Sequence, residues 1–488
     1  MSIRNSVLQT YFARRGRTID LFRRHPLEVQ REMLKQRLAE GVRTSFGQEF
    51  GLQADLTPEA FARALPTFDY DSFKPYIERM FQAEKNVVTL GEVKWFARSS
   101  GTTSDRSKYI PVTTASLLHN HTQGMRDVAS TYVLNYPQST VCDGKVLTLG
   151  GSYQQERGRF VGDLSAVAIK NTPFWSGWFR APKMATALIP DFDAKAEAIC
   201  CECVGQPITA IAGVPSWNLA LMRRILAYTG CKNLLEVWPN LELFAHGGVS
   251  FRPYLRAFEE LIPSPKMHYV ETYNASEGFF ALADDPMRDD MLLMLDYGTY
   301  FEFRQQETIV PLEGVKAGET YVLLVTSNNG LWRYEIGDTI TFTSTDPYRI
   351  RFSGRTRQYI NVFGEELIAD NVEQALACAC EASGAEIEEY TVAPCYMNLT
   401  ERGAHEWVVE FRREPDGLAH FTEVLDHELR ALNSDYDAKR LSTLDPPRIT
   451  VMAHNHFLAW LKSVGKTKIP RLMNDRSVAD RIIGYTND

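Results

Sequence analysis

Short apolar runs alternate with helical segments from about residue 93 onward, and this alternation constrains the fold more than any other feature. The apolar runs lie at 93–97, 145–150, 208–214, 241–248 and 267–273. The segments between them that suit helices are 113–135, 194–204, 216–229 and 252–262. Strands separated by helices are typical of βαβ units, so we expect an α/β fold with a largely parallel sheet.

The pattern changes twice more along the chain. Between 291 and 352 apolar runs follow one another with only turns between them, which is typical of antiparallel strands and of a distorted barrel. The first 60 residues are rich in helix formers. After a boundary near 354–358 the predicted elements are helix 366–382, strands 387–395 and 405–412, helix 418–433, strand 448–453 and a final loop with short helices. We therefore predict a large N-terminal domain with mixed sheets over 1–354, and a small mobile α+β domain over 355–488 with helices on one face of an antiparallel sheet.

Composition excludes several classes of protein. With 488 residues, of which 44% are hydrophobic, the chain has ample material for a core. A net charge of −8 argues against a nucleic-acid partner. The sequence has no apolar run of signal-peptide type or of membrane-spanning length, so we expect a cytoplasmic protein with no membrane partner. Cys200, Cys201 and Cys203 lack a second cysteine pair, which favours a helix with buried thiols over a zinc site.

One loop carries the strongest functional signal. Six consecutive small or hydroxyl residues, Ser99-Ser100-Gly101-Thr102-Thr103-Ser104, leave an apolar strand and are followed by Lys108. Backbone N–H groups, hydroxyls and an ammonium can converge on one polyphosphate from such a loop, whereas the alternative is a flexible Ser/Thr turn. The loop lacks the second glycine of a Walker motif, and Gly465-Lys466-Thr467 also fails because Trp460 stands at the first glycine position. An ordinary P-loop kinase is therefore disfavoured.

Three further segments contain candidate ligand-binding residues. In Tyr273-Asn274-Ala275-Ser276-Glu277-Gly278, a glutamate beside small residues is suited to Mg²⁺ next to a nucleotide, although a solvated turn glutamate is the plainer alternative. In the sequence 333–338, Asp338 follows a glycine and is suited to accept two ribose hydroxyls, although it can also be a β-turn aspartate. Arg355, at the predicted domain boundary, is suited to a phosphate or ribose contact.

These segments occur in one order and together resemble the adenylate-forming superfamily of acyl-CoA synthetases, luciferases and peptide-synthetase adenylation domains. Within it, the chain resembles the Gretchen Hagen 3 acyl-acid amido synthetases over roughly residues 20–480. The segments that carry this resemblance are SSGTTS, WPN at 238–240, YNASEG, RYEIGD and KIPR at 468–471. The sequence Asp105-Arg106-Ser107-Lys108 departs from the Gly-x-Pro-Lys run that is usual in the phosphate loop.

The resemblance implies an ATP-dependent ligase that adenylates a carboxylic acid and transfers the acyl group to the amine of an amino acid or related acceptor. It implies ATP and Mg²⁺ as cofactors, Glu277 as the metal ligand and Lys468 as the catalytic lysine, with Lys466 as the alternative. The nucleotide-binding residues that it implies are Ser99, Ser100, Gly101, Thr102, Thr103, Lys108, Gly247, Gly248, Tyr273, Ser276, Glu277, Asp338 and Arg355. Residues 355–358 resemble the hinge about which the small domain rotates.

Two other functions remain open at this stage. An acid–CoA or other thioester-forming ligase shares the adenylation step and differs in its acceptor. A nucleotide-binding regulatory protein keeps the fold without turnover, but the joint presence of Glu277, Asp338, Arg355 and Lys468 argues against it. The sequence leaves the acid, the acceptor and the oligomeric state undefined.

Overall fold

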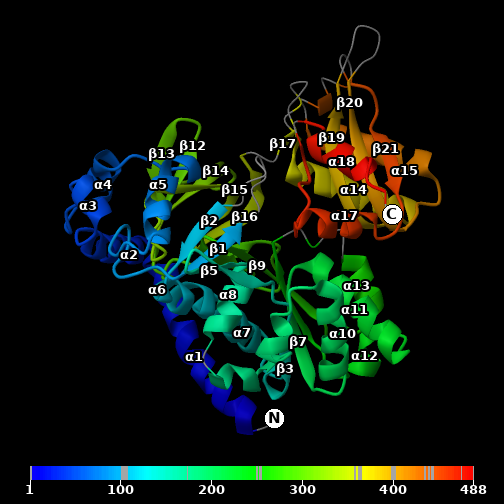
Figure 1. Cartoon of the computed structure of the whole chain (residues 1–488), viewed down its shortest axis with the longest axis horizontal. Helices are drawn as coiled ribbons and strands as arrows, with labels where there is room; N and C mark the ends of the chain where they lie inside the picture. Colours follow the sequence, from blue (N-terminus) through cyan, green and yellow to red (C-terminus); the bar gives the residue numbers. More distant parts are fainter. Residues whose placement is uncertain are drawn as a thin grey trace. The chain divides into compact units, whose positions relative to one another are not determined.

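The computed structural model describes residues 3–99, 108–172, 174–248, 251, 255–356, 359–360, 365, 367–396, 403–433, 436–437, 440, 444–473 and 475–486 (Figure 1). The contacts of the chain group it into two units. One is built from most of the residues up to Phe352, and the other chiefly from Ser353–Asp488. The predicted mixture of helices and strands is confirmed.

The N-terminal region is helical, as the sequence predicts. Its helices are α1 (Ile3–Arg24), α2 (Pro26–Gly41), α3 (Ser45–Glu49), α4 (Pro58–Ala64) and α5 (Tyr70–Phe81). Met33, Leu34 and Leu38 recur at helical spacing on α2 and are buried. Gln30 on the same helix donates two hydrogen bonds of 3.0 Å, to the carbonyl oxygens of Leu295 and Thr299. Helix α2 is thereby fixed to the start of the strand Thr299–Gln305.

A twelve-stranded sheet forms the centre of the first unit. Its strands, in spatial order, are β13 (Thr308–Pro311), β12 (Thr299–Gln305), β14 (Thr320–Ser327), β15 (Tyr334–Thr345), β16 (Tyr348–Arg355), β11 (Met291–Leu293), β10 (Gly278–Leu282), β9 (His268–Ala275), β8 (Leu243–Gly247), β7 (Ile208–Gly213), β3 (Lys145–Thr148) and β6 (Arg180–Ala181). The strands from β9 to β6 pair in parallel, and those from β12 to β14 and from β9 to β11 pair antiparallel.

The predicted antiparallel strands are confirmed, and they continue the parallel sheet, because β9 pairs with β8 on one side and with β10 on the other. One expectation about the strands is wrong. The strand predicted at 93–97 is β1 (Trp95–Ser99), and it lies outside the large sheet. It belongs to a four-stranded sheet with β2 (Lys108–Val112), β5 (Arg159–Gly162) and β4 (Tyr153–Glu156). Apolar runs identify strands, but they carry no information about which strands pair.

Helices cover the strands of the first unit. They are α6 (Thr114–Ser116), α7 (Thr122–Asn135), α8 (Leu164–Asn171), α9 (Met184–Ala187), α10 (Phe192–Cys203), α11 (Pro215–Thr229) and α12 (Leu234–Val237). Helix α13 (Leu255–Leu261) is divided between the two units. A π-helical turn, Leu117–His121, joins α6 to α7. Cys200 and Cys203 are buried on α10, as predicted, whereas Cys201 on the same helix is exposed. All eight cysteines are among the described residues, and none of them forms a disulfide.

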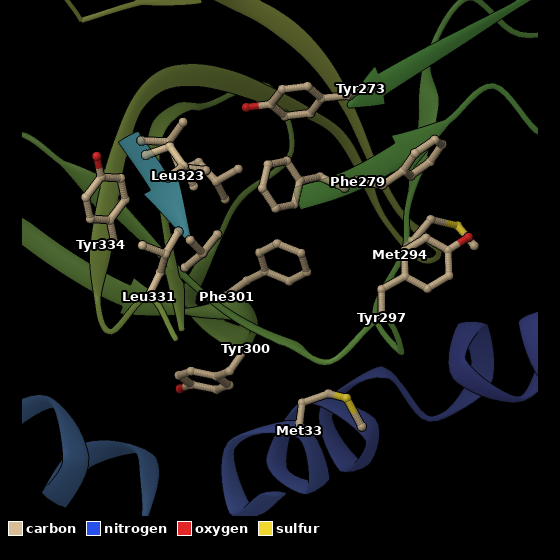
Figure 2. Packing of buried hydrophobic residues seen from close by; sticks show 14 of the residues in the cluster. Met33, Tyr273, Phe279, Met294, Tyr297, Tyr300, Phe301, Leu323, Leu331 and Tyr334 are labelled. Atoms are coloured by element: carbon tan, nitrogen blue, oxygen red, sulfur yellow. The ribbon is translucent and has the colours of Figure 1, made fainter. Parts of the chain in front are cut away.

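The main core lies where the antiparallel strands meet α2. Figure 2 shows aromatic and aliphatic side chains from these elements packed together, including Phe301 from β12, Leu323 from β14 and Met33 from α2. Strands β12 and β14 are buried along nearly their whole length, as expected for strands that are covered on both faces. The core fixes the strands from which the candidate site is built.

The second unit has the predicted order of elements. They are β17 (Tyr359–Ile360), β18 (Leu367–Ile368), α14 (Ala369–Ser383), β19 (Glu386–Cys395), β20 (Ala404–Arg413), α15 (Leu418–Leu432), β21 (Arg448–Met452), α17 (His456–Val464) and α18 (Ser477–Ile483). The sheet is not purely antiparallel as expected, because β21 pairs in parallel with β20. Trp407, Phe421 and Leu425 are fully buried in a core of its own.

Candidate active site

The glutamate segment forms a hairpin turn. Ala275 ends β9 and pairs with Gly278 at the start of β10, so Ser276 and Glu277 form the turn between them. Glu277 is 7% exposed, and its backbone oxygen accepts a 2.8 Å hydrogen bond from the side-chain amide of Asn329. Burial, together with the negative charge of Glu277, raises the pKa of the Tyr334 hydroxyl. The glutamate carboxylate is therefore held on a fixed turn beside the start of β15.

A bulge in β15 orients Asp338. Glu335 pairs with Leu324 and Thr339 with Val322, so the three residues Ile336, Gly337 and Asp338 lie opposite a single residue of β14. Gly337 has a φ of +87°, a conformation that residues with a side chain rarely adopt. Bulges of this kind redirect the side chains beside them. The glycine in the motif is thus required by the backbone that positions Asp338.

The two motifs meet through Tyr273. Its hydroxyl donates a 2.6 Å hydrogen bond to Asp338 Oδ2, and both side chains are buried. Tyr273 lies on β9, three positions before the Ser276–Glu277 turn, and Figure 2 shows its ring beside the β10 aromatics. A hydrogen bond to a charged carboxylate is stronger than one between neutral groups. The candidate ribose ligand is thus fixed by the strand that carries the candidate metal ligand.

The glycine pair at 247–248 lies at the carboxyl end of a parallel strand. Gly247 ends β8 and pairs with Thr272 on β9. A Cβ atom at Gly247 would lie 2.4 Å from the backbone oxygen of Thr272, so no larger residue fits there. Burial lowers the pKa of the preceding His246 to about 3, so its imidazole is neutral. The carboxyl ends of parallel strands are the usual ligand-binding edge of α/β sheets.

The base of the predicted phosphate loop is a β-hairpin. Ser99 at the end of β1 pairs with Lys108 at the start of β2. Lys108 Nζ lies 5.6 Å from the centre of the Tyr70 ring, and the Tyr109 backbone N–H donates a 3.1 Å hydrogen bond to the Tyr70 hydroxyl. Ser100, Gly101, Thr102 and Thr103 lie outside the described residues, so their predicted contact with phosphate stays a prediction.

One short segment links this hairpin to the aspartate strand. Phe68 exchanges backbone hydrogen bonds with the start of β15, donating to the Arg333 oxygen at 3.1 Å and accepting from the Glu335 nitrogen at 2.7 Å. Tyr70, two residues further on, contacts the hairpin base. The first unit therefore connects the loop base, Asp338, Tyr273 and the Glu277 turn through a continuous series of contacts.

Arg333, although part of the same motif, has a structural role. Its guanidinium forms two 2.8 Å contacts with Glu302, and both side chains are 5% exposed. It also donates to the carbonyl oxygens of Ala62 and Leu65. These contacts use four of the five N–H groups of the guanidinium and hold the α4 region against β12 and the start of β15.

Sequence reasoning missed several residues that support the hairpin. Asn329 holds the Glu277 backbone, as described above. Asn120, in the π-helical turn, accepts a 2.5 Å hydrogen bond from the Phe279 backbone N–H, and the neighbouring His121 contacts Asn274 at 3.1 Å. Burial lowers the pKa of His121 to about 4. The sequence signal available for this support was the pair Asn328-Asn329 in the loop after β14. Nothing in the local sequence shows that this loop reaches the β9–β10 hairpin.

The remaining candidates lie at the boundary of the second unit or within it. Gly354 and Arg355 end β16, where the division between the units falls. Lys468 is exposed, and it lies between α17 and α18 on a segment whose Ile469 is buried. Lys466 lies two positions earlier on the same segment and is half-buried. Glu277 and Asp338 therefore belong to the first unit, and both lysines to the second.

The residues of the first unit fit one Mg²⁺ ion bound together with a nucleotide. Mg²⁺ keeps several waters and takes only one or two protein carboxylates when phosphates complete its shell. Among the described residues there is no cluster of three or more metal-ligating side chains, so an all-protein metal cage is not present in that part of the chain. The single Glu277 carboxylate matches the first arrangement.

Comparison with solved structures places the fold in the adenylate-forming class. The chain is similar to the GH3.15 acyl acid amido synthetase in complex with 2,4-DB, with 16% identity over 93% of each chain and a TM-score of 0.77. It is also similar to 2-hydroxyisobutyryl-CoA ligase in its postadenylation state, with 14% identity over 93% of this chain and 92% of that one and a TM-score of 0.60.

The chain belongs to the GH3 family. Its N-terminal domain model matches residues 15–201 and 151–267, its central domain model 292–355 and its C-terminal domain model 370–477. One relative is the indole-3-acetic acid-amido synthetase GH3.8 of Oryza sativa subsp. indica, which is 23% identical over 91% of this chain and 87% of its own length. The family resemblance inferred from the motifs is confirmed.

Helices in the described part of the chain are too short or too polar to cross a membrane.

Proposed function

We propose that this chain is an ATP-dependent acyl-acid amido synthetase. It joins a carboxylic acid to the amine of an amino acid or related acceptor and releases AMP and pyrophosphate. Membership of the GH3 family supports this reaction class. The observation that carries the site assignment is the Tyr273–Asp338 hydrogen bond of 2.6 Å, because it joins the glutamate and aspartate motifs in one place.

The reaction needs two steps because a carboxylate is a poor electrophile. In the first, a carboxylate oxygen attacks the α-phosphorus of ATP and pyrophosphate leaves, which gives an acyl-adenylate. In the second, the amine attacks the acyl carbon, AMP leaves with the oxygen that bridged the two groups, and the amine nitrogen loses a proton. The enzyme must therefore bring one anion against another and keep water from the mixed anhydride.

Residues of the first unit, together with the phosphate loop, hold ATP in this proposal. Asp338 accepts hydrogen bonds from the ribose hydroxyls, while Ser99–Thr103 and Lys108 contact the phosphates. Gly247 and Gly248 lie along the adenine, where the absence of side chains lets a flat base approach the sheet edge. Tyr273, Ser276 and Glu277 complete the nucleotide site. Fixing the nucleotide at both ends sets the in-line geometry that displacement of pyrophosphate needs.

Mg²⁺, held by Glu277, supplies charge neutralisation between the reacting anions when it is bound. Lys468 supplies the second positive charge, near the α-phosphate. A lysine on a separate unit can approach for adenylation and withdraw for transfer. We therefore propose that residues 1–354 and 355–488 act as two domains that rotate about the segment following Arg355, a hinge motion.

The acceptor and the acid are left open by the relatives. One similar protein is named for indole-3-acetic acid and another is bound to 2,4-DB, so the acid varies within the fold. The CoA ligase among the similar structures shares the fold, and a thiol is the alternative acceptor. For location we propose the cytoplasm, since none of the eight cysteines, all of them described, forms a disulfide.

Acid-dependent exchange of labelled pyrophosphate into ATP tests the proposal. We expect exchange with at least one member of a carboxylic-acid panel, and then AMP release with amines but not with CoA. The Lys468→Ala variant should reduce exchange on the order of 10²–10³-fold or more, because one charge near the α-phosphate is lost. Lys462→Ala, on α17, is the matched control and should leave it unchanged. A panel with no exchange, or Lys468→Ala at the normal rate, would refute the proposed reaction or the proposed lysine.

A further inference from the structure

Arg471 is the most heavily anchored residue of the segment that carries Lys468. Its guanidinium carbon lies 4.4 Å from the centre of the Tyr390 ring, and Nη1 donates a 3.0 Å hydrogen bond to the Tyr390 backbone oxygen. The same nitrogen forms an ion pair with Glu389. Stacking, a hydrogen bond and an ion pair thus fix one side chain to two consecutive residues of β19.

The backbone around Arg471 is fixed to the same strand. Thr391 Oγ1 donates a 2.6 Å hydrogen bond to the oxygen of Pro470. The Val392 N–H donates to the Arg471 oxygen at 2.8 Å, and the Met473 N–H donates to the Val392 oxygen at 3.0 Å. The segment therefore runs along the outer edge of β19 as an added parallel strand, with Leu472 beside Val392.

Lys468 stands just before this anchored stretch. Ile469 is buried in a small core with Phe457 and Trp460, and Pro470 restricts the backbone next to it. Because only two residues separate Lys468 from Arg471, the anchor limits where the lysine backbone can lie. The side chains of Arg471 and Glu389 are 13% and 17% exposed, so their pairing is less screened by water than a surface pair.

We propose that Arg471 is a positioning residue that holds Lys468 in place for adenylation. This inference rests on the proposed function and on Lys468 as its lysine. Arg471 acts through the backbone and does not itself contact the reacting atoms. Loss of the anchor leaves the lysine charge present but spread over more positions, and small displacements of a reacting group lower rates by up to about 10²-fold.

A purely structural role for Arg471 makes different predictions. If the contacts only stabilise the second unit, their loss should affect both half-reactions alike. The effect of an Arg471 substitution on the activation free energy should also add to that of Lys468→Ala, since independent sites give additive free energies. A positioning role confines the loss to the half-reaction that uses the lysine, and the effect disappears once the lysine is gone.

The test compares two half-reactions in the full-length protein. In Arg471→Met we expect pyrophosphate exchange to fall about 10- to 100-fold in kcat, with the KM for ATP and for the acid within about two-fold of the original. Amide formation from a supplied acyl-adenylate should keep its rate. Arg471→Lys retains the charge but loses the planar guanidinium, so its exchange rate should lie between those of the unaltered protein and Arg471→Met. The Lys468→Ala/Arg471→Met double variant should be no slower than Lys468→Ala alone.

Two further variants serve as a control and as a milder alternative. Arg476→Met removes an arginine that bonds β19 at Pro394 and pairs with Glu406 rather than with Glu389 or Tyr390, so it should leave exchange unchanged. Glu389→Gln keeps the shape of the partner and should lower exchange a few-fold, in the adenylation half-reaction only. It also serves if Arg471→Met fails to fold.

The inference is overturned if Arg471→Met and Glu389→Gln exchange at the original rate, if both half-reactions fall equally, or if the double variant is additive. These outcomes leave the proposed function standing when the unaltered protein exchanges and Lys468→Ala does not. If the unaltered protein shows no acid-dependent exchange, the proposed function fails together with this inference.

Discussion

At the residue scale, the candidate site depends on the hydrogen bond from the Tyr273 hydroxyl to the Asp338 carboxylate. Tyr273 and Asp338 are 65 positions apart, and each was a candidate nucleotide ligand from its own motif. The structure adds the hydrogen bond between them. A tyrosine that donates to a carboxylate keeps the second carboxylate oxygen oriented, so part of the ribose contact depends on Tyr273.

Replacing Tyr273 with phenylalanine should therefore weaken ATP binding more than catalysis. We expect the KM for ATP to rise several-fold in Tyr273→Phe with a small change in kcat, because the lost bond orients a binding group and is worth about 1–3 kcal/mol. Initial rates at varied ATP measure this. Tyr436→Phe is the matched control, since Tyr436 donates a 2.8 Å bond to Asp426 in the second unit. A rise of similar size in the control would contradict the assignment.

Buried imidazoles make the stability depend on pH. Burial lowers the pKa of His121 to about 4 and of His246 to about 3, whereas an unfolded histidine titrates near 6.5. The unfolded chain therefore binds more protons below pH 6.5, so stability is full above that pH and is lost as pH falls towards 4. We expect a lower urea midpoint at pH 5 than at pH 7.

The variant His121→Gln isolates this effect. Glutamine retains a hydrogen-bond donor for Asn274 but does not titrate, so the difference between the midpoints at pH 5 and pH 7 should shrink. His119→Gln, at an exposed position of the same π-helical turn, should leave that difference unchanged. An unchanged pH dependence in His121→Gln would show that this imidazole is not responsible.

At the element scale, two ion pairs join β12 to β15 and differ in burial. Arg333 and Glu302 are each 5% exposed, whereas Arg304 and Glu335 are 28% and 22% exposed. The first pair also holds the α4 region through backbone carbonyls. In a buried ion pair, removal of one partner leaves the charge of the other without compensation from water. The two pairs therefore allow a comparison within the same strands.

Glu302→Gln should destabilise the first unit far more than Glu335→Gln. Removing one charge of the buried pair leaves an uncompensated guanidinium, which costs about 3–5 kcal/mol of unfolding free energy. The more exposed pair should contribute about 0–1 kcal/mol. Urea unfolding measures both. Equal effects, or a larger loss in Glu335→Gln, would contradict the structural role given to Arg333.

Strand identity could be predicted from the sequence, but strand pairing could not. The apolar runs correctly located β3, β7, β8 and β9. In β7 and β8 nearly every residue is buried, and burial on both faces leaves a local mark in the sequence. Nothing local separates β1 from these strands, or gives β21 its parallel direction. The same limit applies within the site. Glu277 and Asp338 lie in glycine-containing motifs, whereas the support from Asn329 exists only once the loop after β14 reaches the hairpin turn.

At the scale of the whole molecule, the proposed site residues come from both units. The proposed nucleotide ligands between Gly247 and Asp338 belong to the first, and Lys468 with its anchor Arg471 belongs to the second. A catalytic group on a separate unit suits a reaction with two steps of different chemistry, because each step needs a different arrangement of charge. The central claim is that the first step joins the acid to the α-phosphate.

Transfer of oxygen from the acid to AMP tests this claim directly. With a carboxylic acid labelled with ¹⁸O in both carboxyl oxygens, ATP and an amine acceptor, mass spectrometry follows the label. Attack on the α-phosphate predicts that the AMP released with each amide carries one ¹⁸O in its phosphate. Label in inorganic phosphate, or amide formation with unlabelled AMP, would contradict the proposed reaction.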